Sequence, residues 1–137
     1  MKEITLEADI KNLIKVTSFV NEELRKVEAN AKTIASIDII LDEVFSNIAY
    51  YAYKEREEKG DVTVKMDFVE DNKAVVLSFI DDGIPYNPLE KEEPDITLSA
   101  MKRAIGGLGI LIVKKSVDDI KYEYKNNKNI LKLKKYL

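Results

Sequence analysis

The chain has 137 residues, 45% of them apolar, and a formal net charge of −3 at pH 7. These values fit one domain, 1–137, with a full core, and the acidic balance gives no electrostatic footprint for nucleic acid. Cysteine and histidine are both absent, which excludes disulfides, thiolate catalysis, imidazole bases and most transition-metal sites. We expect a cytoplasmic protein, because no apolar run approaches the roughly 20 residues that cross a bilayer and no signal-like segment is present.

The first sixty residues predict one strand and two helices. Alternation over 4–8 indicates a short strand, after which Asp9 can cap a helix that runs to about Ala29. A second amphipathic helix is expected over 32–57, and the turn at Gly60 ends it. The positions expected to face the core are Leu13, Val16, Phe19, Val20 and Leu24 in the first helix and Ile37, Leu41, Val44, Ile48 and Ala52 in the second.

The second half of the chain predicts four strands and one further helix, joined by short turns and one irregular, proline-containing loop. These segments are a strand at 62–68, a hairpin loop at 70–73, a strand at 75–79, the irregular loop at 84–105 (which could become helical after Asp95), a helix at 109–117, a strand at 120–124, a turn at 126–127 and a strand at 130–136. This order favours an α+β two-layer sandwich, with helices packed on one face of a mixed, mainly antiparallel sheet.

Two polar side chains of the second predicted helix share one face. Glu43 and Asn47 are four residues apart and lie at the edge of the apolar stripe, whereas Asp42 points away from it. An acid and an amide at a core boundary could position a hard cation such as Mg²⁺, which prefers oxygen ligands. Taken alone, the pair is better explained as two ordinary residues on the flank of an amphipathic helix.

An acidic side chain is also expected on the core face of a strand. The alternation of 75–79 continues to Asp81, and a carboxylate there is costly unless a donor pairs with it. The exocyclic amine of adenine would be such a donor, and Gly83 would keep the chain clear of the base. The alternative is a plain strand-ending turn, although the residues after Gly83 do not form a returning strand.

Glycine is concentrated in this half of the chain. Four of the five glycines fall within 27 residues: Gly83 follows Asp81, while Gly106, Gly107 and Gly109 surround Leu108 before an apolar run. Free N–H groups at the start of a helix can cradle phosphate. A tight loop before a packed helix explains the cluster equally well when it is judged alone.

Together these pieces resemble, in order and spacing, the GHKL (Bergerat-type) ATP-binding fold of gyrase, Hsp90, histidine-kinase catalytic domains and MutL. Its N-box resembles 43–47, its G1 box 81–85 and its G2 box 107–109. Within that superfamily the resemblance is greatest to the stand-alone bacterial anti-sigma-factor serine kinases. The features that indicate this branch are the small size, Ala52-Tyr53 after the N-box, the continuation Tyr86-Asn87-Pro88 and a short lid.

The resemblance implies a role for each matching residue. Asn47 would ligate Mg²⁺, Asp81 would accept from the adenine amine beside Gly83, and Glu43 would be the general base for an incoming serine hydroxyl. Arg103, in the lid, could meet the γ-phosphate or be a solvated helix residue. The positions expected near the phosphates are Tyr51, Arg103, Gly106, Gly107, Leu108 and Gly109.

The function implied is an ATP-dependent protein serine kinase that controls transcription by partner switching. It would bind ATP or ADP with Mg²⁺, phosphorylate a STAS-domain anti-sigma-factor antagonist and bind a sigma factor or similar target, with a homodimer left open. The alternative is a nucleotide-gated binding module without kinase activity. Two departures motivate it: Tyr51 stands where the family commonly has His or Lys, and no G3 threonine box is found. A bare ATPase, a sensor-kinase fragment and a domain without a ligand are less favoured.

Overall fold

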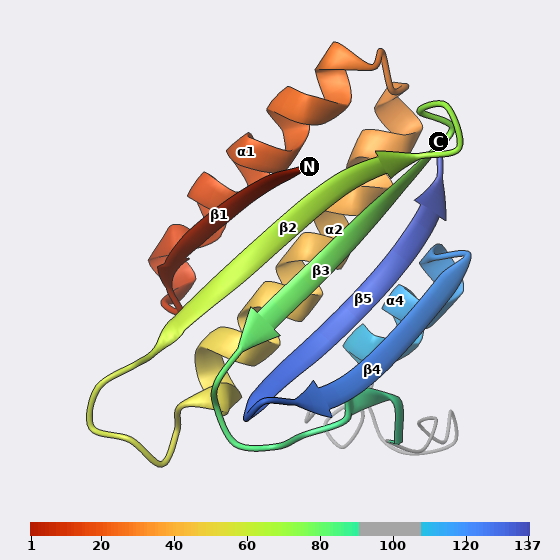
Figure 1. Ribbon diagram of the computed structural model, residues 1–137. Helices are drawn as coiled ribbons and strands as arrows, with labels where there is room; N and C mark the ends of the chain where they lie inside the picture. The colour runs from red at the N-terminus through yellow and green to blue at the C-terminus, as the bar shows by residue number, and fades with distance from the viewer. Residues whose placement is uncertain (91–107) are drawn as a thin grey trace.

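Five strands form one layer and the helices form the other in the computed structural model, which describes residues 1–90 and 108–137 (Figure 1). The sheet order is β1-β2-β3-β5-β4, and every pairing in it is antiparallel. The expected two-layer α+β sandwich is therefore confirmed, with an antiparallel rather than a mixed sheet. The strands are β1 (Lys2–Glu7), β2 (Asp61–Val69), β3 (Ala74–Asp81), β4 (Asp119–Lys125) and β5 (Lys128–Tyr136).

Capping side chains start the first 3₁₀ turn and the second α-helix, whereas the first α-helix begins at Leu13 without a side-chain cap. Asp9 accepts a hydrogen bond from the Lys11 backbone N–H at 3.0 Å, but it caps a 3₁₀ turn that precedes the α-helix. Asn30 caps the second helix by accepting from the Thr33 N–H at 2.8 Å. The helical segments are η1 (Ile10–Asn12), α1 (Leu13–Lys26), α2 (Ala31–Asn47), η2 (Ile48–Ala52), η3 (Pro88–Glu90) and α4 (Leu108–Ser116).

The second helix ends earlier than its sequence pattern predicts. Regular α-helix stops at Asn47, and the π-helical segment η2 carries the chain only to Ala52, so an end at Glu57 is wrong. The reason is Tyr53, which is buried and whose hydroxyl is hydrogen-bonded at the end of the sheet. The chain turns there instead of continuing its helix.

Both predicted hairpin turns are confirmed. Three consecutive residues at 70–72 have positive φ between β2 and β3, and the β4–β5 turn places Asn126 and Asn127 at φ 54° and 61°. Two asparagines in the left-handed region match a type I′ turn, whose twist suits an antiparallel hairpin. The final strand β5 is thereby penultimate in the sheet, with β4 at the edge.

The core lies between the sheet and the helices. Alternate residues of β2, β3 and β5 face it, in register across the strands. Among the described residues, no helix has the length and apolarity that a membrane span requires. Of the predicted core positions, those fully buried are Val16, Val20, Leu24, Ile37, Leu41 and Val44, and those partly buried against the core are Leu13, Phe19, Ile48 and Ala52.

Candidate functional site

Figure 1 shows that β3 ends, β5 begins and α2 finishes at the same end of the molecule. Two buried polar side chains lie at this end of the sheet. Asp81 and Asn129 are register partners on β3 and β5, with only 6% and 7% of their surfaces exposed. The expected core-facing orientation of Asp81 is therefore confirmed. A polar pair in such a position must be hydrogen-bonded to be tolerated.

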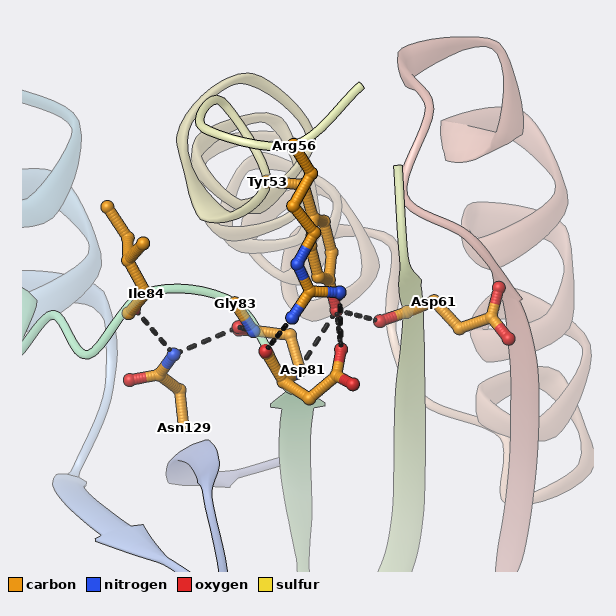
Figure 2. A network of polar contacts seen from close by, with 8 residues as sticks. Tyr53, Arg56, Asp61, Asp81, Gly83, Ile84 and Asn129 are labelled. Carbon is orange, nitrogen blue, oxygen red and sulfur yellow. Dashed lines mark hydrogen bonds and ion pairs between the residues drawn. The ribbon is translucent and has the colours of Figure 1, made fainter. Parts of the chain in front are cut away.

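One oxygen of the Asp81 carboxylate is fully engaged (Figure 2). Its Oδ1 accepts from the Gly83 N–H at 2.9 Å and from Nδ2 of Asn129 at 3.0 Å. Burial raises the pKa of Asp81 above its usual value, and the bonds from Asn129 and Gly83 oppose that rise. Within the described residues Oδ2 has no hydrogen-bond donor.

The amide of Asn129 is itself saturated. Besides Asp81, Nδ2 donates to the Ile84 carbonyl at 2.9 Å, while Oδ1 accepts from the Tyr86 N–H at 3.1 Å and the Tyr122 hydroxyl at 2.5 Å. An amide has two N–H groups and two lone pairs, so none remains for a ligand. Sequence reasoning missed this residue, and the available signal was a polar side chain in phase with Leu131 and Leu133.

A second network fixes the residue after Asp81 (Figure 2). The Tyr53 hydroxyl lies 2.5 Å from the Asp61 carbonyl and 2.8 Å from Oδ1 of Asp82, and it accepts from the Asp82 N–H at 3.0 Å. Arg56 donates to the Asp82 carbonyl at 2.7 Å and lies over the Tyr53 ring, 4.9 Å from its centroid. The Tyr53 bond and the Arg56 charge hold the pKa of Asp82 below its usual value. This network was also missed from the sequence.

Gly83 allows the turn after β3 to pack directly on the end of η2. A Cβ added at Gly83 would lie 2.7 Å from the Ala52 carbonyl carbon, and the Ile84 N–H donates to that carbonyl oxygen at 3.0 Å. Real Cβ atoms do not approach backbone this closely, so a side chain at 83 would force the two segments apart. The turn bearing Asp81 is thus joined to the helical segment that follows Asn47.

Gly109 makes a similar contact on α4. A Cβ added there would lie 2.9 Å from the carboxyl carbon of Glu43 and closer still to its Oε2. The Glu43 carboxylate therefore rests against the first turn of α4, which packs on α2. Gly83 of the expected G1 box therefore packs on η2, and Gly109 of the expected G2 box packs on α2, which carries the expected N-box.

The remaining predicted site residues differ in how exposed they are, and some lie outside the described residues. Glu43 and Asn47 are half-buried and Asp42 is exposed, as the helix geometry predicts, while Tyr51 is 55% exposed on η2. The backbone of Leu108 begins α4. The ligand roles of all these residues stay predictions. Those outside the described residues are Arg103, Gly106 and Gly107.

The donor set fits a weakly held magnesium ion rather than a protein-caged metal. No cluster of three acidic side chains that could hold a metal occurs in 1–90 or 108–137. Asn47 would contribute one amide oxygen, and Mg²⁺ commonly completes its shell with phosphate oxygens and water. Such an ion would be held mainly with its nucleotide.

The sequence matches the model of the histidine kinase-like ATPase domain over residues 6–135. The chain belongs to this family. The expected membership of the GHKL superfamily, an ATP-binding group, is thereby confirmed. A search of curated protein sequences found no match.

Solved structures show the same fold at low sequence identity. The structure of the RsbU and RsbW domains of Rv1364c from Mycobacterium tuberculosis is 18% identical with a TM-score of 0.67; all of this chain aligns with 33% of that one. In the SiaB-SiaC complex from Pseudomonas aeruginosa, a chain 13% identical aligns with all of this chain over 89% of its own length, with a TM-score of 0.69. The catalytic domain of the histidine kinase ThkA is 18% identical over 99% of this chain and 96% of that one, with a TM-score of 0.51.

Proposed function

We propose that this domain is an ATP-dependent protein serine kinase that phosphorylates a STAS-domain anti-sigma-factor antagonist. The observation that carries the proposal is the Asp81 carboxylate, which is buried with one oxygen engaged and the other lacking a donor among the described residues. In this proposal the exocyclic amine of adenine donates a hydrogen bond to the second oxygen. Family membership and the resemblance to stand-alone anti-sigma-factor kinases support the choice of reaction and partner.

Phosphoryl transfer asks a protein mainly for positioning, charge neutralisation and one group that orients the nucleophile. In this proposal, Asp81 holds the base and Asn47 ligates the magnesium ion. Glu43 accepts the proton of the incoming serine hydroxyl, and its position against Gly109 puts it beside the helix expected to face the phosphates. Bound Mg·ATP supplies the phosphoryl group and the neutralising charge.

The test is phosphoryl transfer by a Glu43→Gln variant, which keeps the side-chain size against α4 while removing the base. Asp42→Asn is the matched control, since Asp42 is the exposed neighbour on the same helix. With a purified STAS partner from the same genome and labelled Mg·ATP, we expect Glu43→Gln to bind ATP normally but to lose transfer by about 10²- to 10⁴-fold. Asp42→Asn should match the wild type. Unchanged transfer by Glu43→Gln would remove Glu43 from the mechanism.

A second candidate is a nucleotide-gated binding module that does not transfer phosphate. The exposed Tyr51, at a position where the family commonly has a basic residue, favours it. This candidate predicts that the wild-type protein binds ATP and changes its affinity for a partner without labelling any STAS protein. A wild-type protein that labels a partner serine would exclude it.

A further inference from the structure

The side chain of Asn129 joins three segments around the carboxylate described above. It donates to Asp81 at the end of β3, donates to Ile84 and accepts from Tyr86 in the following turn, and accepts from Tyr122 on β4. The four distances lie between 2.5 and 3.1 Å. A side chain that spends its whole hydrogen-bonding capacity on the protein acts through its neighbours, because it has none left for a ligand.

The hydrogen bond from Asn129 affects both the orientation and the charge of Asp81. Its Oδ1 is held by two N–H donors, so rotation of the carboxylate would break both bonds. Hydrogen bonds to a charged acceptor are stronger than neutral ones and favour its ionised form. Without Asn129, burial would raise the pKa of Asp81 further, and the protonated carboxyl group could donate as well as accept.

We propose that Asn129, held in place by Tyr122, is a positioning residue that sets the base selectivity of the nucleotide site. By keeping Asp81 an acceptor, it favours a purine that carries an exocyclic amine over one that carries a carbonyl at the same position. The inference rests on the proposed function, since it requires that the site bind a nucleotide.

The experiment compares ADP with IDP, whose base has a carbonyl oxygen in place of the adenine amine. Calorimetry in Mg²⁺ would give both affinities for the wild type, Asn129→Leu, Tyr122→Phe and Tyr124→Phe. Asn129→Leu keeps the side-chain size and removes all four bonds, and Tyr122→Phe removes one. Tyr124→Phe is the control: it lies on the same strand, is 44% exposed, and its hydroxyl has no partner among the described residues.

We expect the wild type to prefer ADP by roughly 10- to 100-fold, the range of one hydrogen bond to a charged group. In Asn129→Leu the preference should fall below about 3-fold, because the Asp81 carboxylate loses one of the two donors that fix its orientation. Tyr122→Phe should reduce the preference by about 3- to 10-fold, and Tyr124→Phe should leave it unchanged.

Equal losses of affinity for both nucleotides would show that Asn129 serves folding alone and would overturn the inference. A wild type that binds neither nucleotide would remove the proposed function and this inference with it. Wild-type binding with an unaltered ADP preference in the variants would overturn this inference only. Circular dichroism checks that Asn129→Leu is folded. If Asn129→Leu is unfolded, the test uses Tyr122→Phe, and an unchanged preference for ADP over IDP in that variant counts against the proposal.

Discussion

Replacing Tyr53 with Phe removes one hydroxyl from the end of the sheet and leaves the buried ring in place. In the wild type this hydroxyl accepts the Asp82 N–H and lies within hydrogen-bond distance of the Asp61 carbonyl and the Asp82 carboxylate. A phenol has one hydrogen, so it donates to one of these acceptors at a time. The substitution therefore removes one accepted and one donated hydrogen bond.

The expected loss of stability follows from these two bonds. A neutral hydrogen bond contributes about 1 kcal/mol net, and one to a charged group about 1.5–3 kcal/mol. The lower end applies to the donated bond, because the Asp82 side chain is 49% exposed and solvent screens its charge. We expect the Tyr53→Phe variant to lose about 2–3 kcal/mol in the free energy of unfolding.

Urea unfolding measures this loss. With a slope of about 2 kcal/mol per molar, the midpoint should fall by roughly 1–1.5 M and the slope should not change. Tyr124→Phe, which removes the hydroxyl of a side chain that is 44% exposed, should shift stability by less than about 0.5 kcal/mol. A Tyr53→Phe loss as small as that of the control would refute the reasoning that the hydroxyl anchors the strand end.

The stability lost in Tyr53→Phe should also depend on pH. The bond from Tyr53 lowers the pKa of Asp82 from its usual 3.8, so the folded state favours the ionised carboxylate. The stabilisation that follows is present above pH 3.8 and is lost as the pH falls through the lowered folded-state pKa. The difference in unfolding free energy between wild type and Tyr53→Phe should accordingly shrink in acid.

Three further predictions concern the candidate site. Gly83→Ala would push its Cβ into the Ala52 carbonyl, so we expect the free energy of unfolding in urea to fall by about 1–3 kcal/mol and ADP to bind more weakly. An unchanged free energy and an unchanged ADP affinity would contradict the close approach of Gly83 to Ala52. Asn47→Ala should abolish the gain in ATP affinity that Mg²⁺ gives the wild type, measured by calorimetry with and without a chelator, whereas a retained gain would exclude Asn47 as a ligand. ADP affinity should fall as the pH is lowered through the raised pKa of Asp81, since a protonated carboxyl loses its preference for an amine. A calorimetric profile that stays flat from pH 8 down to the usual carboxyl pKa of 3.8 would count against Asp81 as the base-binding group.

Most of the fold could be predicted from the sequence because its signals are local. Alternation and helix stripes placed the five strands, α4 and the body of α1 to within a few residues, and the Asn126-Asn127 pair marked the last hairpin. The end of the second helix could not be predicted in this way. Its apolar stripe and η2 both end at Ala52, but the charged residues 54–59 give no local stop signal before Gly60. The chain leaves the helical path where the Tyr53 hydroxyl bonds to the end of the sheet.

The candidate site likewise contains one residue that local sequence pattern predicts and one that it does not. Asp81 could be found because a carboxylate in phase with a core-facing strand has a cost that demands a partner. Asn129 was not predicted because an asparagine two residues after an Asn-Asn turn is easily taken as part of that turn. Three of its partners, Asp81, Ile84 and Tyr86, also lie more than forty positions away along the chain. Long-range polar pairing leaves no periodic trace in a single sequence.

Asn129 lies near the C-terminal end of the chain, where the family's threonine box would be expected. The chain lacks a threonine box near its end, and that absence alone favours a degenerate site. Yet β5 places Asn129 in register with Asp81, where its amide holds the carboxylate that a nucleotide would need. On the other side of the turn, Tyr53 holds Asp82. Because Asn129 and Gly83 hold Asp81 and Tyr53 holds the next residue, the missing threonine box is weak evidence that the site has been lost.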